Sequence, residues 1–350
     1  MPFFSIIIPI YNVENYLKEC LDSAVFQTFR DIEIICINDG SSDKSGEIAK
    51  EYAEKDSRIL LIHQENQGPS IARNNALKIA QGKYIIFLDS DDYIEKNLCE
   101  KLYEILQNHP VDVLLMDFFH HTKNNKIYKL RNTFYILQPN KIFSSNEALE
   151  VMMKYYKKHD LFITTIAHFV VKNQFIKDHC ISFDPDVFYY EDILFCTNIF
   201  LKAQTIYNSD IRAYYYVLTP NSIMRGKYNQ QKLIKSANSY YYIAKILKEQ
   251  SLQEVTILKK NLLEKESKTA VHKLLSPLRK LKYHKDLHFN ATDLYKLNHH
   301  YSKIKRININ HPVFYQYIHP LVVSMKYGII TGKNLARRVY AIFFNHYPHL

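Results

Sequence analysis

The chain has 350 residues, enough for two domains, and 47% of them are hydrophobic, which excludes a largely disordered protein. Only 7 Gly and 11 Pro exclude collagen-like and linker-like sequences. The net charge of +11 is uneven, because residues 1–100 carry 10 Lys and Arg against 17 Asp and Glu, whereas residues 229–350 carry 21 against 6. A phosphate site in the first part would therefore need a metal ion or well-placed donors.

Alternating apolar runs and helical patterns fill the first hundred residues. Apolar runs predict four buried strands, at residues 3–10, 31–38, 58–63 and 84–88. The segments between these strands predict three helices. The first begins near Val13, the second ends near Lys55, and the third spans residues 70–81. This alternation predicts an α/β fold with a parallel sheet and helices on both faces.

Beyond residue 100 the pattern is less regular. It predicts helices at 98–108, 146–158 and 193–203, strands at 111–119, 162–171 and 213–218, and hairpin-like pairing within 120–145. From about residue 228 onward, long, basic and aromatic helices are predicted. Five cysteines without a CxxC pair argue against a disulfide framework or a zinc ribbon and favour a reducing compartment. We expect no signal peptide and no transmembrane helix, hence a cytoplasmic protein.

Polar clusters follow two of the predicted strands. Residues 89–92 (DSDD) directly follow strand 84–88, and ligands of open α/β sheets bind beyond the carboxyl ends of the strands. Three adjacent carboxylates suit a divalent cation such as Mg²⁺ or Mn²⁺, although a helix N-cap is the alternative. Asp39 follows strand 31–38 and could accept a hydrogen bond from a nucleobase imide or a ribose hydroxyl, or serve in a turn.

Two further groups lie at predicted helix starts. Arg73 could reach a base or a diphosphate, although an arginine in a helix is usually solvated or salt-bridged. Glu191 and Asp192 could favour the helix macrodipole, or could supply a general base near a metal site.

Taken in order, these motifs resemble those of family 2 glycosyltransferases. They are residues 5–12 (SIIIPIYN), 38–43 (NDGSSD), 66–68 (NQG) with 72–74 (ARN), 89–92 (DSDD) and 191–192 (ED). The resemblance covers residues 3 to about 225. It implies a GT-A fold, an α/β fold with a Rossmann-like, mixed and mainly parallel sheet and helices on both faces. Its nucleotide-sugar-binding half would be 1–110 and its acceptor-binding half 111–228. A basic, mainly helical region at 229–350 follows.

The resemblance also implies roles for individual residues in donor binding. Pro9 and Tyr11 resemble the residues that flank the uracil, and Asp39 resembles the acceptor of its imide proton. Arg73 resembles a side chain beside the base or diphosphate. Arg225, in a loop after the last core strand, could fold over the diphosphate, or could simply face solvent.

The acidic motifs supply the remaining implied roles. Asp89 and Ser90 would lie against the ribose, and Asp91 resembles the ligand of Mn²⁺ or Mg²⁺. Asp192 resembles the general base, with Glu191 beside it. The implied reaction is an inverting, metal-dependent transfer of one hexose or N-acetylhexosamine from a UDP-sugar to a glycan or lipid-linked glycan acceptor. It resembles steps of bacterial lipooligosaccharide, capsule or related surface polysaccharide synthesis.

Some alternatives can be weighed on the sequence alone. Polymerising members of the family carry a QxxRW motif, and this chain has no Trp, which favours non-processive transfer. A nucleotidyltransferase would need a Gly-rich loop, yet residues 5–12 contain no Gly. A binding or scaffold protein without catalysis need not keep clustered carboxylates.

The basic, aromatic segment 229–350 suits an anionic membrane surface, or packs on the core with a solvated basic face. The first of these would make the protein peripheral at the inner face of the cell membrane. We expect no nucleic-acid partner.

Overall fold

The computed structural model describes residues 1–122, 127–128, 136–156, 165–219 and 230–280. The chain forms two compact units, one of residues 1–227 with 249–266 and one of residues 228–248 with 267–350. Helices α8 (Gln230–Gln253) and α9 (Ile257–Lys280) each contribute to both units. Residues 281–350 lie outside the described part, so the membrane-docking role of 229–350 stays a prediction.

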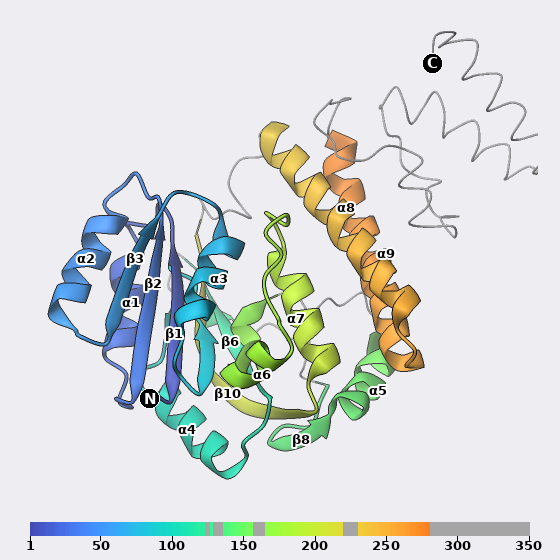
Figure 1. The fold of residues 1–350 in the computed structure, drawn as a ribbon, viewed down its shortest axis with the longest axis horizontal. Coiled ribbons are helices and arrows are strands. Elements are labelled where there is room, and N and C mark those ends of the chain that lie inside the picture. Colours follow the sequence, from blue (N-terminus) through green and yellow to red (C-terminus); the bar gives the residue numbers. More distant parts are fainter. Residues whose placement is uncertain (123–126, 129–135, 157–164, 220–229, 281–350) are drawn as a thin grey trace, which may run out of the picture. The chain divides into compact units, whose positions relative to one another are not determined.

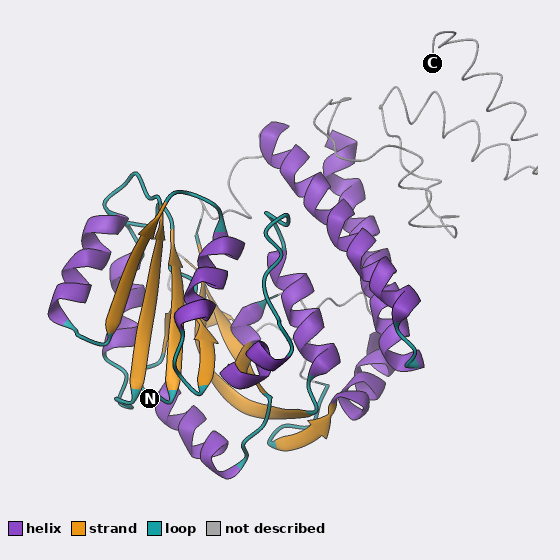
Figure 2. Cartoon of the chain, viewed as in Figure 1, coloured by secondary structure: helices purple, strands orange, loops and turns teal. Residues whose placement is uncertain are grey.

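The first unit is built on one mixed sheet, shown in Figure 2 with helices on both sides. In the described residues its strand order is β3-β2-β1-β4-β9-β6-β10-β5, with β7 paired to β6 and β8 to β10. The first four strands are mutually parallel: β1 (Phe4–Ile10), β2 (Ile32–Asp39), β3 (Ile59–Gln64) and β4 (Tyr84–Phe87). This arrangement confirms the predicted mixed sheet and its parallel first half.

Two layers of helices cover these strands. Helices α1 (Leu17–Val25), α2 (Ser45–Lys55) and α4 (Leu98–Asn108) share one buried core with Ile6 and Ile8 of β1. Helix α3 (Pro69–Ile79) packs on β1 and β2 from the other side (Figure 1). Both isoleucines are fully buried, and each contributes about 1.5–3 kcal/mol relative to an exposed side chain. An apolar strand core between two helix layers explains why these strands read as continuous apolar runs.

The first helix begins later than predicted. Helix α1 starts at Leu17 rather than near Val13, and residues 14–16 before it form a turn. Asn12 adopts a left-handed conformation with φ of 48°. Its side-chain Oδ1 accepts the N–H of Ser42 at 2.8 Å, and its own N–H donates to Ser41 Oγ at 3.2 Å. Asparagine tolerates this conformation better than most residues. Asn12 thus joins the loops that follow β1 and β2.

The second half of the unit continues the sheet with mixed pairing. Strand β9 lies antiparallel between β4 and β6, whereas β6 and β10 are parallel. Strand β10 is longer than predicted, because residues 206–208 pair with both β6 and β8 and Thr205 pairs with β8. Only the last part of the predicted strand 162–171 is confirmed, since Ile166–His168 forms a 3₁₀ turn and residues 162–164 lie outside the described part. The elements are β5 (Tyr93–Ile94), β6 (Val113–Thr122), β7 (Ile127–Tyr128), β8 (Lys141–Ser144), α5 (Ser145–Tyr156), β9 (Phe169–Lys172), α6 (Asn173–Asp178), α7 (Glu191–Lys202) and β10 (Thr205–Leu218).

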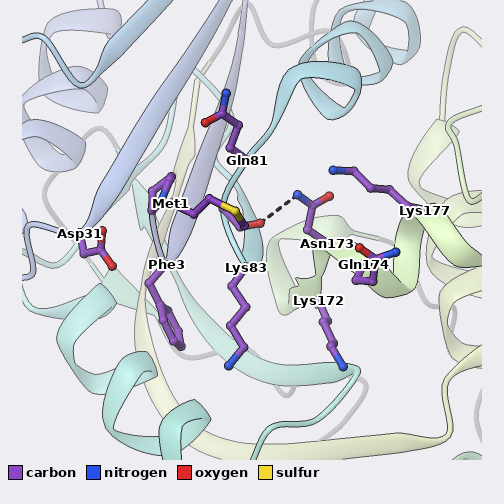
Figure 3. A pocket seen from close by; sticks show the side chains of 11 residues that line it. Met1, Phe3, Asp31, Gln81, Lys83, Lys172, Asn173, Gln174 and Lys177 are labelled. Atoms are coloured by element: carbon purple, nitrogen blue, oxygen red, sulfur yellow. Dashed lines mark hydrogen bonds between the residues drawn. The ribbon is translucent and has the colours of Figure 1, made fainter.

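A cavity of about 300 Å³ opens at the edge where the parallel strands begin (Figure 3). Phe3, Lys83 and Lys172 line it, and Asn173 at its side donates a hydrogen bond to the carbonyl of Gly82. Among the described residues, none of those predicted to bind a donor lines this cavity. It lies at the amino ends of β1 and β4, whereas ligands of such sheets bind beyond the carboxyl ends. In the described residues, no helix is both long and apolar enough to span a bilayer.

Candidate active site

The carboxyl ends of the parallel strands bring most of the predicted site residues to one edge of the sheet. Strands β1, β2 and β4 end there because they are parallel and adjacent. The helices α3 and α7 begin next to this edge and add side chains from their first turns. Arg225 lies outside the described residues. The structure places the remaining predicted residues, which are Pro9, Tyr11, Asp39, Arg73, Asp89, Ser90, Asp91, Glu191 and Asp192.

Asp39 ends β2 and is held by the loop before α3. Its Oδ1 accepts hydrogen bonds from Gln64 Nε2 at 2.7 Å and from the Gln67 N–H at 2.8 Å, and its Oδ2 accepts one from the Gly68 N–H at 2.8 Å. Gly68 has a φ of 89°, a conformation that favours glycine. A carboxylate offers about four acceptor positions, so Asp39 can accept one further donor.

Beside Asp39, the end of β1 presents an aromatic ring. Pro9 is half-buried within the strand, and Tyr11 directly after it is 47% exposed. An exposed ring next to a proline offers an apolar surface on which a planar base can stack. These contacts with a base remain predictions.

The three aspartates of residues 89–92 have different surroundings. Asp92 is 1% exposed and accepts hydrogen bonds from the Tyr214 hydroxyl and the Val217 N–H, both at 2.7 Å. Burial, together with the charges of Asp91 and Asp89, raises the pKa of Asp92. The helix-cap alternative is wrong for these residues, since α4 begins only at Leu98 and β5 intervenes.

Asp91 is the aspartate of this loop whose position suits a metal ion. It is half-buried, and Thr219 Oγ1 donates to its Oδ2 at 3.3 Å. The described residues contain no group of three His, Cys, Asp or Glu side chains that could hold a metal by themselves. Mg²⁺ commonly uses one or two carboxylates and completes its shell with phosphate oxygens and water. Asp91 therefore fits a cation that arrives with a diphosphate.

Arg73 joins the acidic loop to the start of α7. Its side chain is 5% exposed, its Nη2 lies 2.7 Å from Asp89 Oδ1, and its Nη1 lies 2.7 Å from Glu191 Oε1. Asp192 Oδ1 lies 3.7 Å from the same Nη1. The alternative of a solvated arginine is thereby excluded, and the salt-bridged one holds. The predicted contact of Arg73 with a base or diphosphate stays a prediction.

Asp192 has the properties expected of a general base. Its Oδ2 accepts the Ile166 N–H at 3.0 Å, and its Oδ1 is buried without a hydrogen-bond partner. Burial raises the pKa of Asp192 to about 7, against the opposing charge of Arg73 and with a smaller contribution from Glu191. A general base is most effective when its pKa lies near the working pH.

An aromatic cluster lies under this charged group. The rings of Phe183 and Phe195 stack with centroids 3.9 Å apart, and Phe87 meets each of them edge-on at 5.6 Å. Arg73 Cζ lies 5.3 Å from the Phe183 centroid. These apolar rings lower the local dielectric constant, which strengthens the ion pairs of Arg73.

Several residues of the site were not predicted from the sequence. Tyr214 and Thr219 contact the acidic loop, and the backbone of Ile166 binds Asp192. Tyr214 lies in the predicted strand 213–218, but a run of three tyrosines does not show which one faces the loop. The Ile166 contact is made by the backbone and leaves no signal in the residue type.

The chain is similar in sequence to proteins that are named as glycosyltransferases. It matches the model of Glycosyl transferase family 2 over residues 5–179. The uncharacterized glycosyltransferase EpsJ of Bacillus subtilis is 35% identical over 228 residues, which are 65% of this chain and 64% of that protein. The poly(ribitol-phosphate) beta-glucosyltransferase of Bacillus spizizenii is 32% identical over 219 residues, 61% of this chain and 32% of that protein. The matches span less than two thirds of each relative.

The fold is also similar to solved structures. The crystal structure of S. aureus TarS 1-349 in complex with UDP-GlcNAc superposes with a TM-score of 0.57 and 22% identity, covering 91% of this chain and 92% of that one. This likeness confirms the predicted GT-A fold. Since the family model spans half of the chain and includes β1, Asp39, Arg73 and the acidic loop, the chain belongs to glycosyl transferase family 2.

Proposed function

We propose that the chain transfers a single hexose or N-acetylhexosamine from a UDP-sugar to a glycan acceptor in bacterial surface polysaccharide synthesis, with inversion at the anomeric carbon. One observation carries the proposal: Arg73 binds Asp89 of the acidic loop and Glu191 beside Asp192, both at 2.7 Å. A carboxylate with a pKa of about 7 is thus held next to the loop proposed to bind the donor.

Donor binding is assigned to residues at the carboxyl ends of the parallel strands. The remaining acceptor position of Asp39 suits the imide N–H of uracil, a group that an Asp can recognise and that cytosine lacks. Pro9 and Tyr11 would flank the base, and Asp89 with Ser90 would lie against the ribose. Arg225 would meet the diphosphate. The TarS structure with bound UDP-GlcNAc, which shares this fold, supports a UDP-sugar as the donor class.

Asp91 would hold Mn²⁺ or Mg²⁺ together with the diphosphate. When bound, the cation supplies positive charge that offsets the charge growing on the leaving diphosphate. The protein's own contribution is a carboxylate placed by the loop after β4 and contacted by Thr219.

Asp192 would take the proton from the acceptor hydroxyl. The hydroxyl oxygen then bonds to C1 of the sugar as the bond between C1 and the phosphate oxygen breaks, and one such displacement inverts C1. Arg73 and the Ile166 N–H keep the Asp192 carboxylate oriented during this step. A direct displacement requires no nucleophile from the protein.

A panel of nucleotide sugars tests the proposal. With Mn²⁺ present, UDP-sugars should raise the melting temperature and at least one should be slowly hydrolysed, whereas GDP- and CMP-sugars should do neither. Lack of protection by every nucleotide would contradict the proposal. Protection without hydrolysis or transfer would favour a binding protein, and formation of a UDP-sugar from UTP and a sugar phosphate would favour a nucleotidyltransferase.

Asp91→Ala should lose the metal dependence of donor binding while the protein stays folded. In the wild type, Mn²⁺ should strengthen UDP binding, and in the variant UDP affinity should be the same with and without Mn²⁺, as calorimetry can measure. Asp210→Ala is the matched control, because Asp210 is exposed on β10 and belongs to none of the site's contacts. If Mn²⁺ still strengthens UDP binding in Asp91→Ala, the metal is held elsewhere.

A further inference from the structure

The end of β10 contacts all three aspartates of the acidic loop. The Tyr214 hydroxyl accepts the Asp89 N–H at 3.2 Å and donates to Asp92 Oδ2 at 2.7 Å. The Val217 N–H donates to Asp92 Oδ1 at 2.7 Å, and Thr219 Oγ1 donates to Asp91 Oδ2 at 3.3 Å. Residues 214–219, which are the end of β10 and the residue after it, therefore hold the loop along its whole length.

Burial strengthens the hydrogen bond between Tyr214 and Asp92. Tyr214 is fully buried and Asp92 is 1% exposed. A buried carboxyl is costly unless it is hydrogen-bonded, and here one partner of each Asp92 oxygen comes from β10. With both oxygens engaged, Asp92 fixes the far end of the loop.

Asp89 is held from two sides. Its N–H binds the Tyr214 hydroxyl, and its carboxylate binds Arg73. Asp91 lies between Asp89 and Asp92 in the chain, so its backbone is fixed at both ends by the same hydroxyl. Tyr214 thus holds Asp89 and Asp92, which lie before and after Asp91 in the chain.

The course of β10 explains how Tyr214 reaches the loop. The pairing of β10 with β6 shifts register between Asn208 and Arg212 and again between Arg212 and Tyr214. Bulges of this kind re-aim side chains and are frequent next to active sites. Tyr215, the next residue, points elsewhere: it stacks on Tyr93 with centroids 4.6 Å apart, and its hydroxyl donates to Glu95 at 3.0 Å.

We propose that Tyr214 is a positioning residue that sets the affinity of the site for the divalent cation that accompanies the donor diphosphate, acting through the acidic loop. The proposal rests on the proposed function, because it assigns the cation to Asp91. In this proposal Tyr214 touches neither donor nor metal. Strand β10 controls the metal affinity through its contacts with the acidic loop.

Two matched variants test this. Tyr214→Phe removes only the hydroxyl that binds Asp89 and Asp92, and Tyr215→Phe makes the same change one residue away, where the hydroxyl binds Glu95. Mn²⁺ is titrated calorimetrically at fixed UDP, and UDP is titrated without metal. Tyr214→Phe should weaken Mn²⁺ binding roughly tenfold or more, the scale of one lost hydrogen bond to a charged group, with metal-free UDP affinity unchanged. Tyr215→Phe should bind Mn²⁺ as the wild type does.

Equal Mn²⁺ affinities in the two variants would overturn the proposal, whether both match the wild type or both fall together. If Tyr214→Phe does not fold, the Mn²⁺ titration is made on Thr219→Val instead, because this variant removes the hydroxyl that contacts Asp91. It should also weaken Mn²⁺ binding, and wild-type affinity there would overturn the proposal. Wild-type protein that binds UDP but not more tightly with Mn²⁺ would overturn this inference and the assignment of the cation to Asp91, but not the proposed sugar transfer. Wild-type protein that binds no UDP would overturn the proposed function as well.

Discussion

Asp192→Asn is expected to lose most sugar transfer while keeping UDP-sugar binding, with a kcat lower than that of the wild type by about 10²–10⁴. The amide cannot accept the proton of the acceptor hydroxyl. Its oxygen can still accept the Ile166 N–H, the hydrogen bond that orients the native carboxylate. Steady-state rates with donor and acceptor, and calorimetric binding of the UDP-sugar, measure the two effects separately.

Glu191→Gln is the control for this variant, since it changes the neighbouring carboxyl in the same turn of α7. Near-normal turnover in Asp192→Asn together with a large loss in Glu191→Gln would move the base to Glu191. The wild-type kcat should rise with pH through about 7 and then level off, because burial raises the pKa of Asp192 to about 7 and only the ionised form accepts a proton.

The same pKa has a consequence for stability. The folded chain holds a proton on Asp192 up to a pH of about 7, whereas an unfolded Asp releases it near pH 4. The contribution of this group to the free energy of unfolding therefore falls as pH rises from about 4 to 7. Asn cannot ionise, so urea unfolding should show Asp192→Asn gaining stability relative to the wild type between pH 5 and pH 8.

Arg73→Met is expected to have the largest effect on stability. It leaves Asp89, Glu191 and Asp192, each no more than 28% exposed, without their counter-charge. Removing one partner of a buried ion pair costs about 3–5 kcal/mol. Urea unfolding at pH 8 measures the loss, and Arg30→Met is the control because Arg30 is exposed and makes one hydrogen bond at 3.3 Å.

Arg73→Lys separates charge from geometry. A lysine keeps the positive charge, but its single ammonium cannot reproduce the planar fork that reaches Asp89 with one nitrogen and Glu191 with the other. It should recover part of the stability lost in Arg73→Met while kcat stays well below that of the wild type. A fully active Arg73→Lys, or an Arg73→Met as stable as the wild type, would contradict the role assigned to this cluster.

The strands of the first half could be predicted because burial on both faces makes each of them a continuous apolar run. Their shared carboxyl edge followed from parallel pairing, and this placed Asp39 and the acidic loop together. The conformation of Asn12, ahead of α1, could not be predicted, since this residue forms hydrogen bonds with a loop about 30 residues away.

The contacts between residues of the site that are distant in the chain could not be predicted from sequence patterns. Arg73 and Glu191 are 118 residues apart in the chain, and their pairing depends on where α7 packs. The contact of Tyr214 with the acidic loop depends on register shifts in β10, and residue types carry no signal for those. Local patterns report burial and turns, whereas these contacts arise from the packing of distant elements.

The anomeric configuration of the product tests most directly whether Asp192 acts as a base in a single displacement. Loss of activity in Asp192→Asn would also follow if Asp192 were a nucleophile, but the stereochemistry differs. Proton NMR of the product formed from the donor that the panel selects gives the configuration of the new glycosidic bond. We predict the configuration opposite to that of the donor, as one direct displacement requires. Retention would contradict the account, because a single displacement from the face opposite the leaving group cannot produce it.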